Sequence, residues 1–342
     1  MSRCRGFARL TQQRSALRLK PDWFDPFFIL RPTLFFPAWT AFLAGAHQGE
    51  SDDGAILFFL CWLALASGSA FLINEWTDRR EDRHNEKLLP LWGDRFSSRS
   101  LKLELILLIA ATLGGAVFAG VELSALLALF FIIAGVLYNF PPLRLKSRPV
   151  LGVAACGVGG VLLFLIGARA AGAEYSAALL ASLPYFFAGC AVSLLTHVPD
   201  MEGDRACGIR TFPLRYSVRA AGALALLLVV FALSAAVLLR DEVMIAAALL
   251  SLPFFVRFYQ RGTPAGAQTA VKIAVFSLAV MVALTWLPFL VLIAGYYFFA
   301  RWYHRERLGL DYPSFSVKDD AAERSTEATV ISFTQSRYER RR

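Results

Sequence analysis

The stretch AILFFLCWLALASGSAFLIN occupies residues 55–74, and the polar stretch EWTDRRED follows it directly at residues 75–82. The first stretch holds 20 successive residues without a charged side chain. A helix of about 20 apolar residues is long enough to cross the hydrocarbon core of a bilayer. This part of the chain therefore predicts a membrane-spanning helix that ends in an acidic segment.

The composition of the whole chain points the same way. Of 342 residues, 57% are hydrophobic and only 18% are charged. Soluble domains carry about 25% charged residues, so this balance excludes a soluble enzyme, and the excess of hydrophobic residues excludes intrinsic disorder. The five cysteines are scattered through apolar stretches and indicate no disulfide framework. The composition predicts an all-α polytopic membrane bundle, because a chain in lipid must satisfy its backbone hydrogen bonds within helices.

Further apolar runs of spanning length recur along the chain. We predict transmembrane helices near residues 27–46, 55–74, 101–120, 122–140, 149–170, 176–198, 219–239 and 242–258. An apolar stretch follows at 267–300, which as one helix would be about 50 Å long against a hydrocarbon core of about 30 Å. It is therefore either one overlong helix or two helices broken near Pro288, and the bundle has nine or ten helices.

The distribution of basic residues predicts the orientation. With the amino terminus in the cytosol, the cytosolic segments hold nearly all lysines and arginines, including six in residues 1–26 and seven between residues 79 and 102. This asymmetry is the positive-inside pattern. The segment after residue 300 is also basic, and two cytosolic termini require an even number of helices, which favours ten. We predict a basic cytosolic segment over 1–26, a transmembrane domain over 27–300 and a basic, disordered cytosolic tail over 301–342.

The net charge of +9 is explained by this membrane topology and by anionic lipid headgroups. The basic residues sit beside the apolar runs, so we predict the lipid bilayer and no nucleic acid as a partner. We predict a bacterial inner membrane protein with its active site on the cytosolic side. The mitochondrial inner membrane is the alternative, because the first 20 residues contain Arg and Ser but no acidic residue.

An acidic motif closes the helix predicted at 55–74. Asn74, Asp78 and Asp82 are spaced at i, i+4 and i+8, which places all three on one face of a helix. Asp200 and Asp204 repeat the i, i+4 spacing at the end of the helix predicted at 176–198. Two helix ends on the same side of the membrane with carboxylates directed at a shared space predict a Mg²⁺ site, because Mg²⁺ prefers carboxylates, waters and substrate phosphates.

A basic loop supplies the opposite charge. The stretch YNFPPLRLK, residues 138–146, follows the helix predicted at 122–140, and its two prolines end that helix. Arg144 and Lys146 then lie on the same side as the acidic pairs. Cations beside Mg²⁺ suit a diphosphate, which Arg binds through two hydrogen bonds and Lys as a point charge. The glycines Gly152, Gly157, Gly159 and Gly160 predict close helix packing, with cavity lining as the alternative.

These residues resemble the motifs of the UbiA superfamily of intramembrane prenyltransferases. The stretch from Asn74 to Asp82 resembles N-D-x-x-D-x-x-x-D, except that Glu75 replaces the usual Asp, and Asp200 and Asp204 with Gly208, Thr211 and Pro213 resemble the second motif of the family. The stretch at 138–146 is similar to its Tyr/Lys loop, and Arg31-Pro32 opens the first helix as in the family. The likeness extends over about residues 27–260.

The resemblance implies Mg²⁺-dependent transfer of a prenyl group from a polyprenyl diphosphate to a lipophilic, aromatic acceptor of the kind that precedes quinones. It implies that Asp78, Asp82, Asp200 and Asp204 are catalytic, with Asn74 and Glu75 completing the metal ligands. It assigns diphosphate binding to five residues, Arg31, Tyr138, Arg144, Lys146 and Arg205. Two alternatives remain, a terpene cyclase that uses the same diphosphate site and a non-enzymatic transporter.

Overall fold

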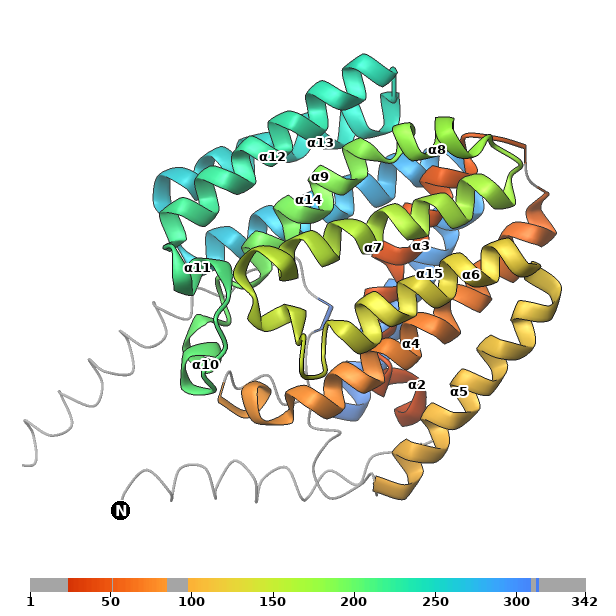
Figure 1. Cartoon of the computed structure of the whole chain (residues 1–342), viewed down its shortest axis with the longest axis horizontal. Coiled ribbons are helices and arrows are strands. Elements are labelled where there is room, and N and C mark those ends of the chain that lie inside the picture. Colours follow the sequence, from red (N-terminus) through yellow and green to blue (C-terminus); the bar gives the residue numbers. More distant parts are fainter. Residues whose placement is uncertain (1–23, 51, 85–97, 309–311, 314–342) are drawn as a thin grey trace, which may run out of the picture.

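The computed structural model describes residues 24–50, 52–84, 98–308 and 312–313, except for the side chains of residues 75, 78–84, 98 and 308. The described chain forms a bundle of helices (Figure 1). The helices are α2 (Asp25–Ile29), η2 (Pro32–Leu34), α3 (Phe35–Ala46), α4 (Asp53–His84), α5 (Ser98–Ala119), α6 (Val121–Phe130), η4 (Phe131–Leu137), η5 (Leu145–Ser147), α7 (Pro149–Ala170), α8 (Tyr175–Ala181), α9 (Leu183–Thr196), α10 (Met201–Ala206), α11 (Phe212–Arg215), α12 (Val218–Leu239), α13 (Glu242–Arg261), α14 (Pro264–Thr285) and α15 (Leu287–Leu308).

Seven segments of the described chain are long and apolar enough to cross a membrane. They are Asp53–Asn74, Arg99–Ala119, Pro149–Ala170, Tyr175–Thr196, Val218–Leu239, Glu242–Arg261 and Pro264–Thr285. The apolar helix Val121–Leu137 is shorter, and α3 and α15 complete the bundle. The prediction of an integral membrane helical bundle is confirmed.

The long apolar stretch at 267–300 forms two helices. Helix α14 ends at Thr285, and α15 begins at Leu287 with Pro288 in its first turn. Proline is well tolerated there, because the first turn of a helix has no hydrogen bond for its missing N–H group to break. The alternative with a break near Pro288 is therefore the one the chain adopts.

The first predicted helix differs from expectation. Residues 27–46 do not form one helix, because the chain leaves α2 at Arg31, whose backbone is left-handed with φ 53°, and re-enters a helical path at Pro32. A residue that precedes proline is sterically disfavoured in the right-handed helical region. Helix α3 is consequently short, and Arg31 lies at a corner of the chain rather than inside a helix.

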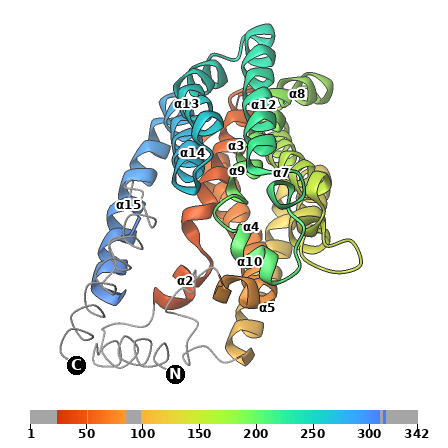
Figure 2. The same ribbon diagram turned by 90° about the vertical axis from the view of Figure 1, so that its left-hand side faces the viewer.

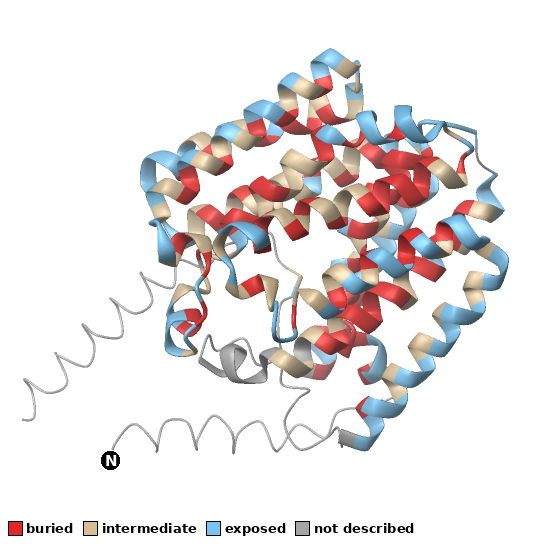
Figure 3. Ribbon diagram, viewed as in Figure 1, coloured by how far each residue is buried: buried red, intermediate tan, exposed pale blue. Residues whose placement is uncertain are grey.

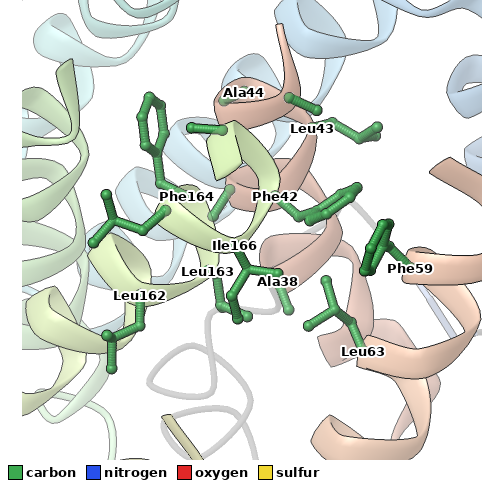
Figure 4. Close-up of a cluster of buried hydrophobic side chains, with 14 of the residues drawn as sticks. Ala38, Phe42, Leu43, Ala44, Phe59, Leu63, Leu162, Leu163, Phe164 and Ile166 are labelled. Carbon is green, nitrogen blue, oxygen red and sulfur yellow. The ribbon is translucent and has the colours of Figure 1, made fainter. Parts of the chain in front are cut away.

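Helices α3 and α7 approach each other so closely that only glycine fits at two of the contact positions. A Cβ atom at Gly45 would lie 1.9 Å from the carbonyl oxygen of Phe164, and one at Gly167 would lie 1.9 Å from that of Phe42. Small residues permit such contacts between membrane helices. The surrounding cluster of buried side chains joins α3, α4 and α7 (Figure 4). Helix α5, by contrast, is largely exposed along one side of the bundle (Figure 3), where its apolar side chains face lipid.

One end of the bundle carries the polar connections. The short helices α10 and α11 join α9 to α12 there, and α10 packs against the end of α4 (Figure 2). The loop between η4 and α7 lies at this same end, because its Lys146 contacts Thr77 in the last part of α4. We call this the polar end and the opposite end of the bundle the far end.

A buried ion pair joins α2 to the last helix of the described chain. Arg307 donates hydrogen bonds to both carboxylate oxygens of Asp25, 2.9 Å from Nε to Oδ1, and the Tyr303 hydroxyl donates to Oδ1 over 2.6 Å. The Arg307 and Asp25 side chains are each only 3% exposed. The ring of Phe28 stacks on that of Tyr303 with centroids 3.6 Å apart. These contacts fasten α15 to the segment that leads into the corner at Arg31.

We expect Asp25→Ala to destabilise the protein by about 3–5 kcal/mol, because it leaves the guanidinium of Arg307 buried without its carboxylate partner. Thermal unfolding in detergent measures the loss. The double variant Asp25→Ala/Arg307→Leu should recover most of it, since the uncompensated charge is removed as well. An unchanged unfolding temperature of Asp25→Ala would contradict the role of this ion pair.

Candidate active site

A cavity of about 470 Å³ lies inside the bundle. Its walls come from α3, α4, η4, α7, α9, α12, α13 and α14, and most of its lining side chains are apolar or small. Asn74 and Tyr138 also line it, and both stand where their helices reach the polar end. The cavity therefore has an apolar body and polar groups at one end, which is the usual character of a small-molecule site.

The second acidic motif lies on α10, beside the end of α4. Asp200 is the N-cap residue of α10, and the backbone N–H of Asp204 donates to the Asp200 carbonyl over 3.0 Å. The two carboxylates therefore stand one helical turn apart on one face, as the spacing predicted. Asp204 is only 8% exposed, and the Oδ1 atom of Asp200 is closed off from solvent. Asp200 as a whole is half-buried, and a buried carboxylate such as that of Asp204 needs a compensating positive charge.

The first acidic motif lies on one continuous helix. Helix α4 runs without interruption to His84, so the backbone positions of Asn74, Asp78 and Asp82 share one face. The side chains of Glu75, Asp78 and Asp82 lie outside the described residues. Among the side chains that are described, no group of three His, Cys, Asp or Glu residues gathers in a way that could hold a metal ion.

The oxygen groups present nevertheless fit a magnesium ion. The half-buried Asp200 and the buried Asp204 lie on a helix that packs against α4, and α4 carries the Asn74 amide at the cavity. Carboxylate and amide oxygens are hard ligands, and Mg²⁺ binds such ligands together with waters and phosphates. The donor set at the polar end is therefore of the right chemical type for this metal.

The basic loop reaches the first motif through Lys146. This side chain is only 6% exposed, and its Nζ donates to the Thr77 hydroxyl of α4 over 3.4 Å. Its backbone N–H donates to the Tyr138 carbonyl over 3.3 Å, which folds the loop back onto the end of η4. The structure thus brings Lys146 next to the residue that precedes Asp78, a contact between residues 69 positions apart.

The other predicted phosphate-binding residues have different surroundings. Arg144 sits at a left-handed backbone position with φ 36°, at the start of the turn that leads to Lys146. Arg31 occupies the corner three residues before Leu34, which lines the cavity. Arg205 is exposed on α10 and does not line the cavity. Lys146 therefore contacts the first acidic motif through the Thr77 hydroxyl.

The glycines of α7 divide between packing and cavity lining. A Cβ atom at Gly157 would lie 2.5 Å from the Cys190 sulfur, and one at Gly152 would lie 2.8 Å from the Leu145 carbonyl oxygen, so both permit close packing. Gly159 and Gly160 line the cavity. The interpretation as packing residues is therefore correct for the first pair, and the cavity-lining alternative is correct for the second.

Sequence reasoning missed the cavity walls formed by α13 and α14. Ala247, Ala248, Ser251, Phe255 and Val275 all line the cavity. A signal was present, because alanine and serine recur on one face of α13 at helical spacing. That signal could not be separated from ordinary packing of small residues between membrane helices.

The fold and this site define an integral membrane protein with an apolar cavity and a charged polar end. The model of the UbiA prenyltransferase family matches residues 34–276, more than half of the chain. The chain belongs to this family. The resemblance seen in its motifs is thereby confirmed.

Curated relatives have several named activities. The digeranylgeranylglyceryl phosphate synthase of Halobacterium salinarum is 32% identical over 174 residues, which cover 51% of this chain and 60% of that protein. The bacteriochlorophyll synthase 33 kDa chain of Cereibacter sphaeroides is 27% identical over 208 residues, covering 58% and 68%. The chloroplastic chlorophyll synthase of Arabidopsis thaliana is 28% identical over 162 residues, covering 45% and 42%. The chain thus spans about 60% of the length of the Halobacterium relative.

Solved structures show the same fold. A UbiA homologue from Archaeoglobus fulgidus bound to GPP and Mg²⁺ superposes with a TM-score of 0.60 at 21% identity, covering 75% of this chain and 98% of that one. A structure of a digeranylgeranylglyceryl phosphate synthase gives a TM-score of 0.57 at 17% identity, covering 76% and 98%. The arrangement of helices described above is therefore that of the UbiA homologues.

Proposed function

We propose that the protein transfers a prenyl group from a prenyl diphosphate to a lipophilic acceptor within the membrane, with Mg²⁺ as cofactor. The observation that carries this proposal is the packing of α10, which bears Asp200 and the buried Asp204, against α4, whose Asn74 lines an apolar cavity. The named activities of the relatives and the GPP and Mg²⁺ bound to the Archaeoglobus homologue support it.

Some residues of the polar end would bind the metal ion, and others would bind the diphosphate. Asp200, Asp204 and Asn74 would hold Mg²⁺ together with the carboxylates of Asp78, Asp82 and Glu75. Mg²⁺ would neutralise the negative charge that develops on the leaving diphosphate. Lys146, whose ammonium group donates to the Thr77 hydroxyl, would bind the diphosphate, and so would Tyr138, Arg144, Arg31 and Arg205.

The apolar cavity would hold the isoprenoid chain away from water. In the proposed reaction the bond between the allylic carbon and the diphosphate oxygen breaks, and both electrons leave with the diphosphate. The acceptor then forms a bond to the allylic carbon and loses a proton. A dry cavity favours this course, because water would otherwise capture the allylic cation.

The acceptor and the membrane are further parts of the proposal. The relatives described above are named for glyceryl phosphate and chlorophyll products. We therefore propose a lipophilic acceptor, and an aromatic quinone precursor is the narrower prediction. We propose a bacterial inner membrane with the polar end in the cytosol, or the mitochondrial inner membrane as the alternative, because the basic residues gather on that side.

Purified protein in detergent, incubated with Mg²⁺ and radiolabelled geranyl, farnesyl or geranylgeranyl diphosphate, tests the proposal. The acceptor panel holds a prenylglyceryl phosphate, a chlorophyllide and an aromatic quinone precursor. We expect Mg²⁺-dependent formation of one labelled product and its loss with EDTA. Cyclised products formed without any acceptor would instead indicate a terpene cyclase, and no consumption of any diphosphate would contradict both enzymes and leave the transporter.

Glu75 offers a test of the first motif at the position where the chain departs from the family pattern. We expect Glu75→Asp to remain active, because a carboxylate is retained, and Glu75→Gln to lose about tenfold to a hundredfold in activity, as is common when a group that supports a metal site loses its charge. Initial rates at saturating Mg²⁺ provide the comparison. Full activity of Glu75→Gln would show that this carboxylate takes no part in the site.

A further inference from the structure

The segment that leads into Tyr138 has an unusual backbone. Helix α6 passes at Phe131 into η4, which is a π-helix over Phe131–Leu137. In a π-helix each N–H group bonds to the carbonyl five residues before it, and such helices are rare and frequent at functional sites. The N–H of Tyr138 keeps this pattern, since it donates to the Ile133 carbonyl over 3.0 Å. A π-helix therefore leads directly into a residue that we propose to bind the diphosphate.

The wide helix explains why Tyr138 reaches the cavity. Phe130, Ala134 and Tyr138 are spaced four residues apart, and all three line the cavity. In an α-helix of 3.6 residues per turn, each step of four residues turns by about 40°, so Tyr138 would be turned about 80° away from Phe130. A helix with more residues per turn keeps this spacing closer to one face. The π-helix thus brings Tyr138 to the cavity wall.

The end of the π-helix leaves two carbonyl groups without their usual backbone donors. In an α-helix the carbonyls of Ala134 and Gly135 would accept from the N–H groups of Tyr138 and Asn139. The first of these N–H groups bonds one residue earlier, as described above, and that of Asn139 donates to the Val136 carbonyl over 3.2 Å. The following N–H group also donates to Val136. Buried carbonyls need another donor in this situation.

The side chain of Asn139 takes the place of these donors. Its Nδ2 atom donates to the Gly135 carbonyl over 2.9 Å and to that of Ala134 over 3.5 Å. A reversed amide would direct its oxygen at two carbonyl oxygens, so the nitrogen lies on this side. Asn139 is only 2% exposed and does not line the cavity. Its Oδ1 atom is closed off from solvent without a partner, so the donor atom alone anchors this amide by hydrogen bonds.

The backbone on either side of Asn139 connects this anchor to the basic loop. The Lys146 N–H donates to the Tyr138 carbonyl over 3.3 Å, and the Arg144 N–H donates to the Phe140 carbonyl over 2.8 Å. Asn139 lies between the two accepting residues, so its side chain anchors the segment onto which the loop folds. The positions of Tyr138 and Lys146 therefore depend on the same few residues.

We propose that Asn139 is a positioning residue for prenyl transfer, whose side-chain amide stabilises the end of the π-helix and thereby holds Tyr138 at the cavity wall. This inference rests on the proposed function, in which Tyr138 binds the diphosphate, and it adds a residue that does not itself line the cavity. A misplacement of about 1 Å in an active site can lower the rate about a hundredfold, so a residue outside the cavity can control turnover.

Asn139→Ala and Asn139→Ser form a matched pair that differs by one hydroxyl group. Alanine removes the donor, whereas serine can donate to the carbonyl four residues before it, as Ser69 and Thr112 do elsewhere in the bundle. The substrate is whichever of geranyl, farnesyl or geranylgeranyl diphosphate the wild-type protein uses. We expect kcat/KM for this diphosphate to fall about tenfold to a hundredfold in Asn139→Ala and to stay within about threefold of the wild-type value in Asn139→Ser. The KM for the acceptor should change little in both.

A double-mutant cycle with Tyr138→Phe tests whether Asn139 acts through Tyr138. Tyr138→Phe removes the hydroxyl group and should itself lower kcat/KM. In that background we expect Asn139→Ala to cause less than about a threefold further loss, because the effects of residues that act through one another are not additive. Ser124→Ala is the control in the same membrane segment, since Ser124 also donates to a backbone carbonyl, that of Ala116, and does not line the cavity. It should show wild-type kinetics.

Wild-type kinetics of Asn139→Ala overturn the inference. Equal losses in Asn139→Ala and Asn139→Ser, or a full-sized further loss in the Tyr138→Phe background, overturn it as well. If Asn139→Ala does not fold, as judged by size-exclusion chromatography in detergent, Asn139→Leu replaces it, and unfolding of both assigns the amide a purely structural role, which also overturns the inference. Failure of the wild-type protein to use any prenyl diphosphate contradicts the proposed function instead, so the two failures are distinguishable.

Discussion

Replacement of Asp204 by asparagine is expected to reduce prenyl transfer at least a hundredfold while the helices remain folded. Asparagine has nearly the same shape as aspartate but carries no negative charge. Asp204 is only 8% exposed on a helix that packs against α4, so few other groups could take its place. A metal ion contributes several kcal/mol of charge stabilisation to such reactions, and about 1.4 kcal/mol corresponds to a tenfold change in rate.

The adjacent residues provide the control for this experiment. Glu202 lies on α10 between Asp200 and Asp204 but is exposed, so Glu202→Gln removes the same charge from the same helix without changing either aspartate. We expect Asp200→Asn to resemble Asp204→Asn, and Glu202→Gln to resemble the wild-type protein. Activity measured as a function of Mg²⁺ concentration separates weakened metal binding from a lower maximal rate.

The same loss of turnover is expected for Asp78→Ala and Asp82→Ala, because these positions share the face of α4 on which Asn74 reaches the cavity. Circular dichroism and size-exclusion chromatography in detergent show whether each variant is folded. The proposed site is wrong if all four aspartate variants retain activity near that of the wild-type protein in a Mg²⁺-dependent assay.

Lys146→Ala is expected to lower kcat/KM for the prenyl diphosphate about tenfold to a hundredfold. A charge-assisted hydrogen bond contributes about 1.5–3 kcal/mol, and about 1.4 kcal/mol corresponds to a factor of ten. Lys146 is 6% exposed and its ammonium group lies 3.4 Å from the Thr77 hydroxyl, one residue before Asp78. Because charge moves onto the leaving diphosphate in the transition state, we expect kcat to fall as well as KM to rise.

A lysine in this position could also serve only to orient the helix in the membrane. Arg219→Ala distinguishes the two roles, because Arg219 is an exposed basic residue at the start of α12 on the same side of the bundle. If both residues are only topological signals, the two variants should behave alike and the kinetics should be those of the wild-type protein. Wild-type kinetics of Lys146→Ala, with membrane insertion confirmed, would remove Lys146 from the diphosphate site.

Most of the helices could be predicted from local sequence. The structure places helices at Pro149–Ala170, Val218–Leu239 and Glu242–Arg261, close to the predicted runs at 149–170, 219–239 and 242–258. Apolar length decides these cases, because a spanning helix satisfies its backbone hydrogen bonds internally and needs no partner to do so. The predicted extent of the first helix, residues 27–46, was wrong. Pro32 disfavours the right-handed helical region for Arg31, so the helix is interrupted there.

The candidate site was predictable in its residue types and spacing but not in its contacts. The i, i+4 spacing of the carboxylates on α10 is a property of the local sequence. The backbone hydrogen bond from Asp204 to Asp200 shows that the two residues lie one helical turn apart. The contact between Lys146 and Thr77 joins two segments that are far apart along the chain. The residue pattern within either segment therefore cannot predict this contact.

Local sequence was therefore sufficient for the membrane-embedded helical class and the helical spacing of the acidic motifs, because hydrophobic length and the 3.6-residue period act within a single helix. It left one helix or two open at residues 267–300, and the structure decided for two. The apolar cavity, the division of the α7 glycines between packing and lining, and the contacts of α15 with Thr33 and Phe36 emerged only when the helices packed together. These features depend on which faces of distant helices meet, since small residues serve equally well for close packing and for leaving space.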